Sequence, residues 1–62
     1  MKPVRKIRLL KEITMDDIFL QTKISISKLS RIERGIFQPN EIEKKLISEA
    51  LKEPVSKIFP EK

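Results

Sequence analysis

The sequence predicts an all-α fold, a single domain of five helices over residues 1–62. Apolar residues recur every three or four positions, as they do on helices that bury one side. No four-residue stretch shows the clean alternation of apolar and polar residues that is typical of a strand. Residues that favour helix ends divide the chain at short intervals, and a chain of 62 residues is long enough for one domain only.

The first helix is expected to begin near Pro3, because proline suits the first helical turn. Its apolar stripe is formed by Val4, Ile7 and Leu10, and Leu9 broadens the stripe. This side of the helix is therefore expected to face the core.

Two short helices are predicted next, over residues 15–22 and over residues 26–34. Thr14 and Ser25 each precede one of these helices, and both residue types favour the N-cap position. Gly35, the only glycine of the chain, follows the second helix, where a left-handed C-terminal residue is favoured.

A fourth helix is expected after Pro39, with Asn40 as its N-cap. Its apolar residues follow helical spacing and are Ile42, Leu46, Ile47, Ala50 and Leu51. A last short helical turn starts at Pro54 and carries Val55, Ile58 and Phe59.

The chain is basic, with 14 Lys and Arg against 9 Asp and Glu, a net charge of +5 and a pI near 9.8. Such a charge attracts polyanions. The excess is concentrated in residues 1–12, whereas residues 36–62 are balanced. A solvated helix face and a surface that contacts a polyanion both fit this distribution.

Several functions are disfavoured by composition. The chain has no His, Cys, Tyr or Trp and no glycine-rich phosphate loop, so we expect neither an enzyme nor a metal, cofactor or small-molecule site. The adjacent Asp16 and Asp17 point about 100° apart on a helix and do not form a catalytic dyad. The absence of cysteine fits a reducing cytoplasm. No apolar run approaches the ~20 residues of a membrane span or forms a signal peptide.

Residues 14–35, TMDDIFLQTKISISKLSRIERG, resemble the helix-turn-helix of the Cro/C1-type (XRE) repressor family. The family pattern there is Thr-Gln-x-x-Leu-Ala, a turn glycine, a Ser cap and an amphipathic helix that ends in Ile-Glu-x-Gly. The positions that match without a gap are Thr14, Ile18, Ser25, Leu29, Ile32, Glu33 and Gly35. The resemblance covers roughly residues 4–59, since Pro39 falls at the loop proline and SEALKEPVSKIF is similar to the closing segment.

The resemblance implies a compact five-helix bundle of the lambda-repressor-like type, in which the second and third helices form the helix-turn-helix. It also implies sequence-specific binding of double-stranded DNA and transcriptional regulation, of the repressor kind, in the cytoplasm. A weak homodimer, formed in solution or only on DNA, is the expected assembly.

Three positions depart from the family pattern. Met15 stands where a glutamine is usual, and Phe19 replaces an alanine that lets the two helices pack closely. The Phe19 substitution requires that the helix pair open slightly or that the ring turn aside. Lys23 replaces the turn glycine and is expected to adopt a positive φ.

The resemblance places residues 26–34 in the major groove of DNA. The residues it assigns to bases or the adjacent groove are Ile26, Ser27, Lys28 and Arg31. Arg31 suits a bidentate contact to guanine, and Ile26 suits a thymine methyl group. The alternative is an ordinary solvated helix face that has no partner.

Phosphate contacts are expected from Thr14, Met15, Lys23, Ser25, Ser30 and Arg34. The free amides at the start of a helix bind anions, so Thr14 combines a structural cap with such a contact. Lys6 and Lys11 on the first helix are expected to add contacts that do not depend on DNA sequence.

Arg8 and Glu33 are expected to form a structural ion pair, as the family commonly has, because a glutamate near the core needs a partner. Ile36 and Phe37 form an apolar dipeptide in the loop after the third helix. Local packing under the fourth helix and a dimer contact are both open for this dipeptide.

A second function fits the same fold. Residues 22–25, TKIS, together with Ile18 also resemble the cytoplasmic helix-turn-helix of RodZ-type cell-shape proteins, which binds an actin-like filament. Those proteins continue into a membrane span and usually carry an aromatic where Leu29 stands. They also lack an arginine-rich outward face, which helical spacing predicts here from Arg31 and Arg34. Joint exposure of Leu20, Ile26 and Phe37 would favour this protein-recognition function.

Overall fold

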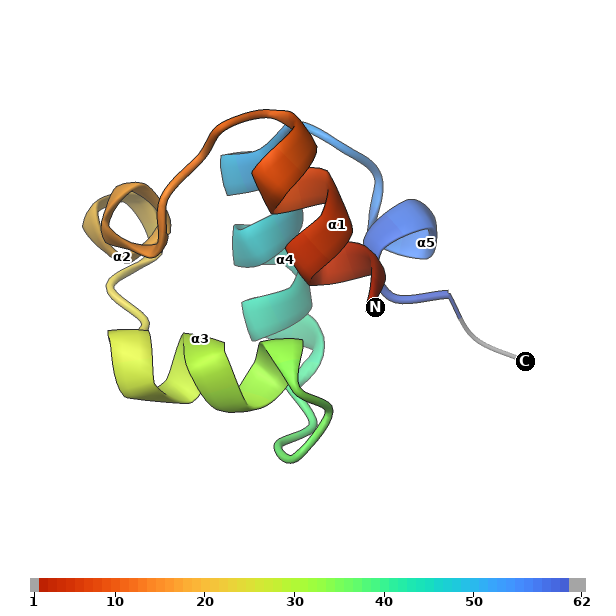
Figure 1. Ribbon diagram of the computed structural model, residues 1–62. Helices are drawn as coiled ribbons and strands as arrows, with labels where there is room; N and C mark the ends of the chain where they lie inside the picture. Colours follow the sequence, from red (N-terminus) through yellow and green to blue (C-terminus); the bar gives the residue numbers. More distant parts are fainter. Residues whose placement is uncertain (1, 61–62) are drawn as a thin grey trace.

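The computed structural model describes residues 2–60, which form five helices and no strand. The helices are α1 (Pro3–Leu10), α2 (Met15–Thr22), α3 (Ile26–Glu33), α4 (Glu41–Leu51) and α5 (Val55–Ile58). Helix α4 stands at the centre, and the other four helices lie around it (Figure 1). The all-α prediction is confirmed. No helix within residues 2–60 has the length and apolar character needed to cross a membrane.

Capping boxes begin the second and fourth helices. The Thr14 hydroxyl accepts a hydrogen bond from the Asp17 amide at 3.0 Å, and the Asp17 carboxylate accepts one from the Thr14 amide at 3.0 Å. Asn40 and Glu43 repeat this exchange at 2.8 and 2.9 Å. Each box satisfies amides that the first helical turn leaves without partners, so these two predicted N-caps are confirmed, as is Ser25.

Left-handed residues end α2 and follow α3. Lys23 has a φ of 64° and Gly35 a φ of 77°, as expected from their positions in the sequence. The turn after α2 is supported by Thr22, whose hydroxyl donates to the Ile18 carbonyl at 2.7 Å and accepts from the Ile24 amide at 3.1 Å. Only three residues, 23–25, join α2 to α3.

All five helices contribute to one apolar core around α4. Its buried members are Val4, Ile7, Ile18, Ile24, Leu29, Ile32, Ile47, Ala50, Leu51 and Ile58. Ile47 and Leu51 of α4 are fully buried. Because a domain of this size buries only about 60% of the surface of its unfolded chain, each of these side chains matters for stability.

Three apolar side chains expected in the core are instead exposed. Leu9 is 46% exposed, Leu10 is 74% exposed and Ile42 is 72% exposed. On α1 the inward position one helical turn after Val4 is occupied by Arg8, which is 8% exposed because it pairs with an acidic partner in the interior. The apolar spacing alone did not identify this polar member of the buried face.

Lys11 joins the C-terminal ends of α1 and α4. Its ammonium group donates to the carbonyls of Leu51 and Lys52 at 2.8 and 3.3 Å and lies 2.9 Å from a Glu53 carboxylate oxygen. Cations stabilise the carbonyl groups that a helix leaves unpaired at its C-terminus. Lys11 therefore has a structural role, and its contact with phosphate stays a prediction.

Three carboxylates have lowered pKa values. A hydrogen bond from Lys28 lowers the pKa of Glu43, and a hydrogen bond from Lys11 lowers the pKa of Glu53. The pKa of Asp17 is lowered by the backbone amide in its capping box. The ordinary values are 3.8 for Asp and 4.5 for Glu, so the unfolded chain binds protons more tightly at these sites than the folded chain does.

Acid is therefore expected to destabilise the fold. The stabilisation from these groups is fully present above the unfolded pKa values and is lost as the pH falls through the lower folded values. Thermal unfolding should show a melting temperature that decreases from about pH 5 to about pH 3. Glu53→Gln should make this decrease shallower, because it removes one of the titrating groups. An equal decrease in both proteins would contradict the assignment to Glu53.

Candidate nucleic-acid interface

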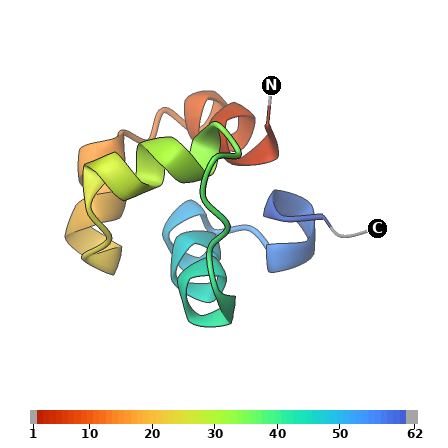
Figure 2. The same ribbon diagram turned by 90° about the horizontal axis from the view of Figure 1, so that it is seen from below.

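Helix α3 lies at the edge of the molecule and presents one face to solvent. Seen from below, it lies in front, and no other helix of residues 2–60 covers its outer side (Figure 2). Its buried side consists of Leu29, Ile32 and Glu33. Ser27 and Arg31 are exposed on the outer side. Ser27 and Arg31 therefore form an exposed polar surface on the outer side of this helix.

The start of α3 adds an apolar side chain and a capped turn to this face. Ile26 is 41% exposed beside the polar residues. The Ser25 hydroxyl accepts a hydrogen bond from the Lys28 amide at 3.2 Å. The amides of the first helical turn have no partner within the helix, and they point along the positive end of its dipole. An anion brought to this end of α3 would be stabilised.

The Met15 side chain is not suited to the phosphate contact that was expected of it. Its side chain is half-buried and packs against the core. A thioether donates no hydrogen bond, so only the backbone amide of this residue is suited to a phosphate. Thr14 is exposed and occupied as the N-cap of α2.

The aromatic ring at position 19 is partly exposed and lies near a lysine. Phe19 is 37% exposed, and the ammonium group of Lys23 lies 6.0 Å from its ring centroid. Lys23 is exposed on the turn between α2 and α3. The Phe19 side chain is therefore only partly buried, at a position that is usually an alanine in the family resembled.

Two basic residues of the α3 segment are engaged within the protein. Lys28 forms an ion pair with Glu43 of α4, and its ammonium group lies 4.7 Å from the Phe37 ring centroid. Arg34 is exposed, and its Nε donates to the Ser30 carbonyl at 3.4 Å. Ser30 is half-buried. Lys28 therefore points toward α4, and Arg31 is the cation on the outer face.

The two side chains of the apolar dipeptide after α3, Ile36 and Phe37, lie in different environments. Phe37 is 37% exposed and lies against Lys28, and it also lines a groove of about 390 Å³ together with Ile32 and Pro39. Ile36 is 67% exposed. Local packing accounts for Phe37, and Ile36 remains at the surface.

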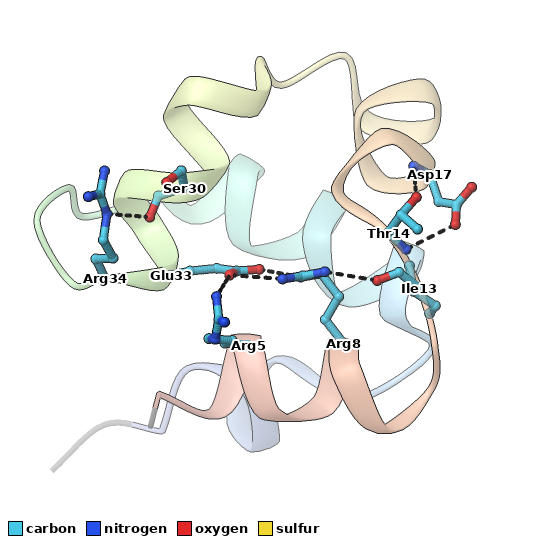
Figure 3. Close-up of polar contacts among 8 residues, drawn as sticks. All are labelled: Arg5, Arg8, Ile13, Thr14, Asp17, Ser30, Glu33 and Arg34. Atoms are coloured by element: carbon cyan, nitrogen blue, oxygen red, sulfur yellow. Dashed lines mark hydrogen bonds and ion pairs between the residues drawn. The ribbon is translucent and has the colours of Figure 1, made fainter.

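A buried ion pair fixes α1 to the end of α3. Arg8 Nε lies 2.5 Å from Glu33 Oε2, and its second terminal nitrogen lies 3.3 Å from Oε1 (Figure 3). Arg8 also donates to the Ile13 carbonyl at 3.2 Å. Arg8 and Glu33 are 8% and 4% exposed, so the expected pair is present and lies in the interior.

A third member of this cluster was missed from the sequence. Arg5 Nη1 lies 3.7 Å from Glu33 Oε1, and its side chain is 51% exposed. Arg5 and Arg8 are three residues apart on one helix, a spacing that places side chains on the same face. That spacing was the available signal.

Comparisons of the chain with protein-family models, with characterised proteins and with solved structures found no match. Among residues 2–60, no group of three or more His, Cys, Asp or Glu side chains could hold a metal ion. Within residues 2–60, the candidate site consists of the uncovered face of α3, on which Ser27 and Arg31 are exposed, and of the N-termini of α2 and α3.

Proposed function

We propose that the chain binds double-stranded DNA sequence-specifically and regulates transcription in the cytoplasm, as a repressor, without catalysing a reaction. Helices α2 and α3 would act as a helix-turn-helix of the Cro/C1 type in a lambda-repressor-like bundle. Residues 26–34 would enter the major groove. The observation that carries this proposal is the uncovered outer face of α3, on which Ser27 and Arg31 are exposed.

Base recognition is assigned to the exposed residues of α3, from Ile26 and Ser27 in its first turn to Arg31 in its last turn. Arg31 has the planar donor group that pairs with guanine, and Ser27 donates or accepts with any base edge. Ile26, at 41% exposure, offers an apolar contact to a thymine methyl group. Lys28 lies in the same segment, but its ammonium group is paired with Glu43, so no base contact is assigned to it.

Phosphate binding is assigned to helix N-termini and exposed cations. The amides near Thr14 and Ser25 begin α2 and α3, and the dipole of each helix favours an anion there. Lys23 and Arg34 are exposed cations on either side of α3. Ser30 is half-buried and is the weakest of the predicted contacts. The net charge of +5 supports attraction to the duplex.

Titration of a fluorescent duplex with the protein at several salt concentrations tests the proposal. Binding is expected to weaken with salt, by about 0.9 in the logarithmic slope for each phosphate contact. Selection from a random duplex library should then yield a preferred sequence that binds more tightly than the starting pool. A chain that binds no duplex at low salt would refute the proposal.

We also expect two chains on each preferred site. One recognition helix reads only a few base pairs, and a two-fold pair reads two half-sites about 34–36 Å apart, which is one turn of the duplex. Sedimentation of the complex should give two chains per symmetric site, with a weak dimer or a monomer in the absence of DNA. Tight, specific binding of one chain to a single asymmetric half-site would contradict this expectation.

The second candidate function is recognition of a protein partner, as in the RodZ-type proteins. The observation that favours it is the exposure of Leu20 and Ile26, at 62% and 41%. Phe37 favours it less, because its ring is held beside Lys28. The same titration discriminates between the two functions, since a protein-recognition domain would not bind duplexes with a steep salt dependence.

A further inference from the structure

Lys28 is held in place by residues from two other segments. Its ammonium group forms an ion pair with the Glu43 carboxylate on α4. The Phe37 ring lies on another side, with its centroid 4.7 Å from the ammonium nitrogen, a distance that suits a cation–π contact. Only 36% of the Lys28 side chain is exposed. A lysine in the first turn of α3, next to the exposed Ser27, is thus directed back toward the protein.

The Glu43 carboxylate is held by the capping box of α4 as well as by the lysine. Its Oε1 accepts the Asn40 amide at 2.9 Å in the capping box of α4, and its Oε2 faces Lys28. The Glu43 side chain is only 14% exposed. One oxygen therefore serves the helix cap while the other is available for the lysine, so the two roles can be separated by substitution.

We propose that Glu43 is a positioning residue that holds Lys28 away from the nucleic acid and so limits binding that does not depend on sequence. This inference rests on the proposed function. A carboxylate oxygen and a phosphate oxygen compete for the same ammonium group. Lysine is a point charge on a flexible stem, so a released Lys28 can reach any phosphate near α3. With Lys28 held, Arg31 carries a larger share of the contacts, and it is the residue suited to bases.

Glu43→Gln tests the proposal without removing the cap. Glutamine keeps an oxygen for the Asn40 amide, as capping boxes accept both residue types, but it removes the charge that faces Lys28. We expect the logarithmic salt slope to steepen by about 0.9, the value of one added phosphate contact. Affinity for a random duplex should rise severalfold at low salt, with less gain on the preferred site.

Glu49→Gln is the matched control. Glu49 is exposed on the same helix, and its substitution changes the net charge of the chain by the same amount. It should leave the salt slope unchanged. If Glu43→Gln and Glu49→Gln bind a random duplex alike, Glu43 does not hold Lys28 back and the proposal is wrong. Thermal unfolding of both variants checks that each is folded.

Lys28→Gln supplies the reciprocal measurement. In the wild-type background it should leave the salt slope unchanged, whereas in the Glu43→Gln background it should restore the wild-type slope. A decrease in slope of about 0.9 in the wild-type background would show that Lys28 already contacts phosphate, which overturns the proposal.

A readout without DNA separates this inference from the proposed function. The Glu43 carboxyl titration, followed by NMR, should show a higher pKa in Lys28→Gln than in the wild type, because the hydrogen bond from Lys28 is lost. No change in this pKa would overturn the inference even if the chain binds DNA normally. If neither the wild type nor any variant binds a duplex, the proposed function fails and this role of Glu43 fails with it.

Discussion

Replacing Glu33 with glutamine is expected to lower the free energy of unfolding by about 3 kcal/mol. The substitution removes the only acidic charge in contact with Arg8 in the described chain, and Arg8 is 8% exposed. A guanidinium group left in the interior without its counter-charge keeps the cost of desolvation and loses the attraction that offset it. For a chain of this size the melting temperature should fall on the order of 12–24 °C.

Urea unfolding followed by circular dichroism measures the loss in the free energy of unfolding. If Glu33→Gln is largely unfolded, variants with smaller expected effects still test the ion pair. Arg5→Gln should cost under about 1 kcal/mol, because half of the Arg5 side chain is exposed. The double variant Arg8→Met with Glu33→Met should be more stable than either single variant, since an apolar pair leaves no buried charge alone. A double variant less stable than both singles would contradict this account of the ion pair.

The helix boundaries were predictable because local interactions determine them. Thr14, Ser25 and Asn40 each bond to an amide three residues later, and this contact requires no distant partner. Gly35 and Lys23 occupy left-handed positions that follow from where the helices must end. Start and stop signals of this kind lie within one helical turn of the boundary that they set.

The buried faces were predicted less completely, because burial depends on what the helix meets. Leu10 has the same apolar character as Val4 and lies six residues away, yet it is 74% exposed. Arg8 lies between them and is buried, since Glu33 from α3 supplies its counter-charge. The family resemblance implied this pair, and apolar spacing alone did not. A polar residue that is buried by a partner 25 residues away leaves no periodic signal in its own helix.

In the candidate site, too, some features follow from the local sequence and others depend on distant residues. Exposure of Ser27 and Arg31 follows from helical geometry once the inward residues of α3 are known. The position of Lys28 does not, because it depends on Glu43 of α4 and on Phe37 of the connecting loop. Helical spacing places Lys28 at the flank of the outer face of α3. Its ammonium group turns toward α4 and not toward solvent because Glu43 and Phe37 contact it.

Arg31→Ala is expected to weaken binding to the preferred duplex by about 1–3 kcal/mol and to relax discrimination at one base position. Arg31 is exposed on the outer face of α3, one helical turn beyond Ser27, where a long planar donor can reach the floor of the major groove. Arg31→Lys keeps the charge but loses the fork of two donors that matches guanine. It should therefore lose most of the discrimination while retaining the salt slope.

Lys6→Ala is the matched control for this measurement. Lys6 is exposed on α1. Like Lys11 it was expected to contact only the phosphate backbone, and it is the clearer control because the Lys11 ammonium group also donates to the Leu51 carbonyl. The loss of Lys6 should weaken all duplexes about equally and make the salt slope shallower by about one unit. A competition titration of preferred against random duplex at two salt concentrations distinguishes the two kinds of contact. If Arg31→Ala weakens both duplexes alike, Arg31 contacts phosphate, and base recognition must be sought at Ser27 and Ile26 instead.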